Sequence, residues 1–353
     1  MLNRSHAPSS RSHTPSSRSH RGAAFGVGLT ALSLAACDQT PTLPETAADP
    51  PQVVLPPSFA RVDVGVPSRP PNGVTFADFS EIDRELAAAG LDVRLGVVEY
   101  LTLAESDEQG LTVFTFNRGN KQLVFDWVSG DPRRGGGTNI TYMVDEGEGA
   151  ATGGLTNGET EPAIDRAMGT WNSVQCSGAD LSVDKLPWNG IDLGVVQLIL
   201  GFGGTTVVFV DLSHAGWLPK AFFSAPPFFP PDGGDFILAA TFTFGFIDGS
   251  GNFTDINGDR KLDAALREIY YNNNFPWGID TGFPIDVETV VLHESGHGLS
   301  QAHFGFIFVT DANGTLHFAP RAVMNAAYSG VQQAPTGTDS GGHCSIWGNW
   351  PNN

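Results

Sequence analysis

The chain has 353 residues, of which 41% are hydrophobic and only 16% are charged, and its formal net charge at pH 7 is −19. This composition is too apolar for a disordered chain and too poor in charged residues for a helical bundle. The 43 Gly, 24 Pro and 24 Phe favour strands, turns and long loops. An acidic surface repels phosphate backbones, so the composition excludes nucleic acid as a partner.

The first 37 residues are predicted to be a signal peptide. Four arginines and no acidic residue precede an uncharged run over residues 22–36. This run is long enough for the apolar region of a signal peptide and shorter than the roughly 20 residues that span a bilayer. Residues 34–37, Leu-Ala-Ala-Cys, resemble the lipobox of bacterial lipoproteins. We expect an exported protein of the bacterial cell envelope or surface whose only membrane anchor is lipid on Cys37, with plain secretion as the alternative.

The rest of the chain divides by composition. Residues 38–74 contain nine Pro and are interpreted as a Pro-rich tether. Residues 75–130 are expected to form a small α+β N-terminal subdomain, and the sequence leaves open whether it is a removable pro-segment. A Gly-rich break over residues 131–137 leads into the main domain, residues 135–353.

Within residues 75–130, a short helix is predicted over residues 80–90, with Ser80 as its N-cap and Gly90 at its end. Two strand-like stretches, 111–117 and 121–129, are predicted to pair as a hairpin.

We expect an α+β fold for the main domain, in which strand-like stretches combine with two helices, the first of them amphipathic. Strands are expected at residues 138–144, 195–200, 205–212 and 236–246, and helices at residues 161–174 and 286–299.

The second of these helices contains His293-Glu294-Ser295-Gly296-His297. Residues four apart on a helix lie on one face, so both imidazoles can bind one Zn²⁺, and Glu294 can take a proton from water bound to that metal. The alternative is a helix with two surface histidines. The apolar residues 290–292 directly before the motif indicate a buried helix and argue against that alternative.

A third zinc ligand is required, and no Glu follows Glu294 in the chain. His303 lies ten residues after His293, and on an unbroken helix it would point away from the other two histidines. The helix is therefore predicted to end between His297 and His303. Either Gly298 or Ser300, in a left-handed backbone conformation, can make that turn.

The pattern of His293, Glu294, His297, Ser300 and His303 resembles the zinc motif HExxHxxGxxH of the metzincin proteases, and in particular their matrixin-type members. Ser300 stands where that family has Gly. The segment around Met324, residues 322–325, is similar to the family's methionine turn. The resemblance covers about residues 135–353.

The resemblance implies a zincin-like fold, with a twisted mixed sheet, a backing helix, and an active-site helix beside an edge strand at residues 216–223. It implies a monomeric zinc-dependent metalloendopeptidase that hydrolyses peptide bonds of extracellular proteins, with Glu294 as the general base. The substrate would be an extended peptide or protein segment paired with the edge strand. The alternative is a non-catalytic surface lipoprotein that binds zinc or calcium together with peptides or polymers.

A second metal site is predicted at Asp255, Asn257, Asp259 and Asp263. These residues occupy positions 1, 3, 5 and 9 of a loop that resembles an EF-hand or dockerin-type Ca²⁺ loop. Arg260 stands at position 6, where an EF-hand has Gly. A polar turn between two strands is the alternative.

Two cysteines, Cys176 and Cys344, follow Cys37. Two thiols in an exported protein favour a disulfide. In some metzincins, the astacins, a disulfide links the two regions in which these residues lie. The resemblance therefore implies a Cys176–Cys344 disulfide. Two separately buried thiols are the alternative.

Overall fold

The structure is a computed structural model. It describes residues 79–104, 110–114, 123–147, 154–176, 181–279, 285–309 and 316–352. The predicted signal peptide, Cys37 and the tether at residues 38–74 lie outside these residues, so they stay predictions. None of the helices in the described part of the chain has the length and hydrophobicity to cross a bilayer.

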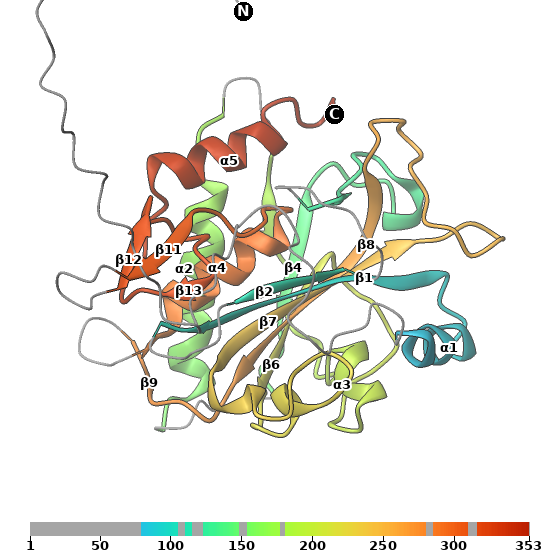
Figure 1. Ribbon diagram of the computed structural model, residues 1–353. Coiled ribbons are helices and arrows are strands. Elements are labelled where there is room, and N and C mark those ends of the chain that lie inside the picture. Colours follow the sequence, from blue (N-terminus) through green and yellow to red (C-terminus); the bar gives the residue numbers. More distant parts are fainter. Residues whose placement is uncertain are drawn as a thin grey trace, which may run out of the picture. The chain divides into compact units, whose positions relative to one another are not determined.

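A mixed, twisted sheet of nine strands organises the described residues (Figure 1). Its strand order is β13-β1-β7-β8-β6-β4-β5, and the short strands β2 and β3 pair with β1 and β8. Strands β4, β5, β6 and β8 are parallel, whereas β7 runs antiparallel to both of its neighbours, β1 and β8. The strands are β1 (Val93–Leu103), β2 (Leu111–Phe114), β3 (Phe125–Asp126), β4 (Ile140–Val144), β5 (Val183–Lys185), β6 (Leu212–Leu218), β7 (Ile237–Phe246), β8 (Leu262–Asn272) and β13 (Ala327–Tyr328).

Helices cover both faces of this sheet, and each face has its own apolar core. Side chains of α2 (Asn157–Asn172), α4 (Val287–Gly298) and α5 (Gly337–Trp347) belong to one core. Side chains of α1 (Ser80–Ala88) and α3 (Val195–Ile199) belong to the other. Two small ladders lie apart from the main sheet: β9 (Trp277–Gly278) with β10 (Ile285–Asp286), and β11 (Phe306–Val309) with β12 (Leu316–Ala319). The predicted α+β class and mixed sheet are confirmed.

Several predicted elements form as expected. Strands β4 and β7 and helix α4 lie within two residues of their predicted bounds. Helix α2 begins four residues earlier than predicted, because Glu159 accepts hydrogen bonds from the backbone and hydroxyl of Thr156 and caps the helix there. Ser80 was the wrong N-cap: Phe79 occupies that position, and Ser80 is the first helical residue of α1.

The N-terminal hairpin prediction is wrong. Strand β2 pairs with β1, and β3 pairs with β8, while residues 115–122 lie outside the described part. Strand β1, which the sequence reasoning missed, lies between β7 and β13. The expected division between residues 75–130 and 135–353 is therefore not seen in the sheet, because β1 shares a ladder with β7.

Two further strand predictions are wrong. Residues 195–199 form helix α3, because the buried carboxylate of Glu268 accepts hydrogen bonds from the backbone N–H groups of Val195 and Val196 and fixes the helix start. The strand expected at residues 205–212 begins only at Leu212, as β6.

The edge strand predicted at residues 216–223 ends at Leu218, as part of β6. Strand β6 pairs with β4 over residues 212–214 and with β8 along its length, and all its residues are buried. Residues 222–224 form a short 3₁₀ helix instead of continuing the strand.

Candidate metal centre

Helix α4 carries the HExxH sequence, and contacts along its length fix its position. Asp286 caps its first turn by accepting hydrogen bonds from the backbone and hydroxyl of Thr289. Three buried indoles donate to backbone carbonyls at the middle and end of this segment: Trp171 to Leu292, Trp127 to Gly298 and Trp347 to Leu299. These tryptophans come from three distant parts of the chain, so the helix that carries the histidines is held from several sides.

The chain turns sharply after α4, as predicted from the position of His303. The helix ends at Gly298, and Ser300 has a left-handed backbone with φ of 70°. The buried guanidinium of Arg267 supports this turn, since its Nη1 donates to the Gly298 carbonyl at 2.7 Å and to Ser300 Oγ at 3.0 Å. Of the two residues considered for the turn, Ser300 makes it.

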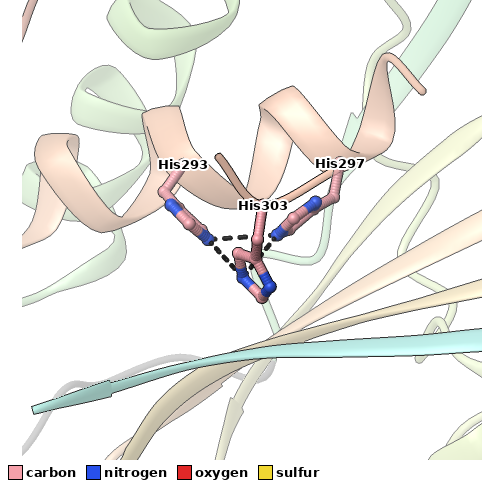
Figure 2. Close-up of side chains that lie close together, drawn as sticks. All are labelled: His293, His297 and His303. Atoms are coloured by element: carbon pink, nitrogen blue, oxygen red, sulfur yellow. Dashed lines mark hydrogen bonds between the residues drawn. The ribbon is translucent and has the colours of Figure 1, made fainter. Parts of the chain in front are cut away.

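The turn brings His303 back to the two helical histidines (Figure 2). The Nε2 atoms of His293 and His297 lie 3.0 Å apart, and each of them lies 3.2 Å from the Nε2 atom of His303. Figure 2 shows the three rings converging, with strands of the sheet passing beneath them. In the described part of the chain, this is the one cluster of at least three potential metal-ligating side chains.

The nitrogen separations fit a tetrahedral zinc ion. Zn–N bonds of roughly 2.05 Å at tetrahedral angles place ligand nitrogens about 3.3 Å apart. The Nδ1 atoms of His293 and His297 face the carbonyl oxygens of Val323 and Gln301, at 2.7 and 2.8 Å. Each Nδ1 therefore carries the proton, and the lone pairs of the two Nε2 atoms face each other. A cation between them removes that repulsion.

The electrostatics of the cluster favour the ligand form of histidine. Burial lowers the pKa of His293 and of His297 to about 3. Burial also lowers the pKa of His303, and its two histidine neighbours lower it further. All three rings are thus neutral at pH 7, as metal binding requires.

Glu294 lies buried on the side of α4 that faces the sheet. Its Oε2 accepts a hydrogen bond from Thr241 Oγ1 at 2.6 Å, whereas its Oε1 has no hydrogen-bond partner among the described residues. Burial raises the pKa of Glu294 well above its ordinary value, the Thr241 hydrogen bond opposes this shift, and the charge of Glu99 adds to it. A divalent cation nearby would oppose the rise and favour the carboxylate.

Glu99 is a site residue that the sequence reasoning missed. It lies on β1, fully buried, with its Oε1 3.1 Å from His297 Nδ1. The available signal was a carboxylate inside the otherwise apolar run of residues 95–101. Acids are rarely buried without a partner, so such a residue marks a polar site.

Met324 lies against α4 between the two helical histidines. A Cβ atom on Gly296 would come 2.3 Å from its sulfur, so only glycine leaves room for the methionine there. Asp339, in the first turn of α5, accepts hydrogen bonds from the backbone N–H groups of Val323 and Met324 and holds this turn in place.

The metal centre is closed. The exposed fractions of His293, Glu294 and His297 are 1% or less, and His303 reaches 7%. A cavity of about 10 Å³, close to the size of one water molecule, lies between Leu101 of β1, His293 and the segment 322–332. An extended peptide does not fit into this space.

The predicted calcium loop forms a polar turn. The side chains of Asp255, Asn257 and Asp259 accept hydrogen bonds from backbone N–H groups of the loop itself. Asp263 is buried and pairs with Arg133 at 2.7 Å. The three aspartates do not form a metal-ligating cluster. This geometry favours the polar-turn alternative over a calcium site.

The structure joins Cys176 to Cys344 in a disulfide with a Cα–Cα distance of 5.2 Å. This agrees with the pairing that the sequence predicted. The bridge connects the segment after α2 to α5, the two helices that lie with α4 on the same face of the sheet.

Comparisons with protein-family models and with curated proteins find no match for this chain. Its function is therefore inferred from the chemistry and geometry of its own residues.

Proposed function

We propose that the protein is a zinc-dependent metalloendopeptidase with a zincin-like catalytic domain. The observation that carries the proposal is the convergence of three neutral histidine Nε2 atoms, 3.0–3.2 Å apart, with the buried carboxylate of Glu294 on the same helix as two of them. Zinc supplies a Lewis acid that polarises a scissile carbonyl and makes water a better nucleophile at neutral pH.

The roles of the residues follow from their positions. His293, His297 and His303 hold the metal through Nε2. Glu294 acts as the general base: its Oε1 has no partner among the described residues and can accept the proton of the attacking water, while Thr241 orients the other oxygen. The same carboxyl group can then pass a proton to the leaving amine. Met324 packs against α4 at Gly296, the residue before His297.

Peptide cleavage requires the centre to open. His303 is the most exposed of the three ligands, and the neighbouring Phe304 is 42% exposed. We therefore place the approach of the peptide on the His303 side, instead of along the buried strand β6. The substrate class remains an extended segment of an extracellular protein.

A second function is favoured by the burial of the site. A catalytic zinc needs a coordination position that substrate can reach, whereas a structural zinc is closed. Four side chains that are 0–7% exposed fit a non-catalytic zinc lipoprotein of the cell surface. Glu294 favours catalysis, because holding zinc requires the histidines and not this acid.

One experiment separates the two functions: zinc analysis and peptide-library cleavage on residues 38–353, with the wild type, Glu294→Gln and His303→Ala side by side. We expect the wild type to bind one zinc and cleave peptides. Glu294→Gln should keep the zinc and lose activity by about 10²–10⁴-fold, and His303→Ala should lose the zinc.

Zinc binding without cleavage in the wild type would support the non-catalytic function. Cleavage by Glu294→Gln at the wild-type rate would rule out the proposed mechanism. Wild-type zinc affinity in His303→Ala would show that His303 is not a ligand.

A further inference from the structure

Strand β1 is an internal part of the sheet and lies under the metal-binding helix. It pairs with β7 along most of its length, from Val93 opposite Phe246 to Thr102 opposite Ile237. Its side chains alternate between the two cores: Val97 and Leu101 pack with α4, while Val98 and Tyr100 pack with the opposite face. Residue 99 lies between Val97 and Leu101 and points to the same face as they do.

This alternation places the carboxylate of Glu99 under α4. Glu99 stands opposite Thr241 in the β1–β7 ladder, and Thr241 donates to Glu294. On its other side, Glu99 Oε1 lies 3.1 Å from His297 Nδ1. Strand β1 thus places a carboxylate beside Nδ1 of His297, while Nε2 of the same ring faces the metal.

We propose that Glu99 is a positioning residue of the metal centre, through which the N-terminal strand β1 orients His297 and strengthens its bond to zinc. Carboxylates on the far nitrogen of ligating histidines fix the ring orientation and increase ligand basicity, and their loss typically weakens metal binding 10–100-fold. The Nδ1 atoms of both helical histidines face a backbone carbonyl, that of Val323 for His293 and that of Gln301 for His297. Glu99 adds a carboxylate beside Nδ1 of His297, so His297 is the ligand that it supports.

The surrounding charges fit this role. Glu99 and Glu294 are both buried acids. Burial lowers the pKa of the nearby Arg267 to about 10, and the charges of Asp126 and Glu99 oppose this shift. The carboxylate of Glu99 beside His297, and that of Glu294 on the same helix, would supply negative charge to a dication in this buried region.

The inference has a consequence for the N-terminal region. Residues 93–103 complete the metal centre, so removing them as a pro-segment would weaken zinc binding instead of activating the protein. This inference rests on the proposed zinc centre and not on peptide cleavage.

The test compares Glu99→Gln with a matched control, Glu268→Gln, in the full-length mature chain. Both residues are acids whose exposed fraction is 1% or less, and both lie on central strands. Glu268, however, caps α3 and is not part of the metal centre. Zinc affinity is measured by competition with a chromophoric chelator, and the visible spectrum of the Co²⁺ form reports ligand geometry. Thermal unfolding of the metal-free proteins reports folding.

We expect the dissociation constant for zinc to rise 10–100-fold in Glu99→Gln and to stay within about twofold in Glu268→Gln. The Co²⁺ spectrum should change in Glu99→Gln alone. Wild-type affinity and spectrum in Glu99→Gln would overturn the inference, as would equal weakening in both variants. If the wild type binds no zinc, the proposed function itself fails, which is a separate outcome.

Discussion

Ser300 takes a left-handed backbone at the turn between His297 and His303, so replacing it with glycine tests two opposing effects. Glycine would remove the backbone strain, which is worth roughly 1–2 kcal/mol. It would also delete the hydroxyl that accepts a hydrogen bond from the buried guanidinium of Arg267 at 3.0 Å. Hydrogen bonds to charged groups contribute about 1.5–3 kcal/mol, and glycine costs a further 0.5–1 kcal/mol or so in chain entropy.

The losses exceed the gain, so we expect Ser300→Gly to lower the free energy of unfolding by about 1 kcal/mol. Ser300→Ala keeps the strain and loses the hydrogen bond, so it should lower the free energy by about 2 kcal/mol. Urea unfolding of the metal-free proteins measures both values. The order of stability should be wild type, then glycine, then alanine. A glycine variant more stable than the wild type would refute the argument that Arg267 compensates for the strained turn.

Three further predictions concern the disulfide, the buried histidines and the predicted lipid anchor at Cys37. Reducing the Cys176–Cys344 disulfide, which closes a loop with a sequence separation of 168, should lower the free energy of unfolding by up to about 5 kcal/mol. Equal urea midpoints with and without reductant would contradict this. Burial lowers the pKa of His214, His293 and His297 to about 3. The unfolded chain, with histidine pKa values near 6.5, therefore binds more protons than the folded chain between about pH 6.5 and pH 3, and stability should fall as the pH falls through this range. At pH 5 the loss is about 2 kcal/mol for each histidine, and a pH-independent unfolding curve for the metal-free protein would exclude it. Finally, Cys37→Ser should move the protein from the membrane fraction to the soluble fraction, whereas a wild-type mature N-terminus at another residue, mapped by mass spectrometry, would remove the lipid-anchor prediction.

The sequence predicted the parts of the site whose signal is local. The spacing of His293, His297 and His303 required a helix that ends early, and the structure has that end at Gly298. The pattern around residues 236–246 predicted β7 because the run is apolar and contains four consecutive β-branched and aromatic residues, 241–244. In these segments the local preference and the tertiary environment agree.

The parts that failed depend on contacts between distant residues. Residues 195–199 have a strand-like composition, but Glu268, more than seventy positions away, caps them as a helix. The contact between Glu99 and His297 spans nearly two hundred positions. Whether a strand is exposed or covered, as with the buried strand β6, depends on its neighbours and not on its own side chains.

The three tryptophans that donate to carbonyls of α4 and of the residue that follows it make this segment optically visible. Trp127, Trp171 and Trp347 are fully buried, and each indole N–H is bonded to the backbone of that segment. The emission of an indole depends on the polarity around it and on its hydrogen bond. Any loosening of the histidine-bearing helix would therefore shift the intrinsic fluorescence of the protein, and its native tryptophans could serve as an internal probe of metal loading without an added label.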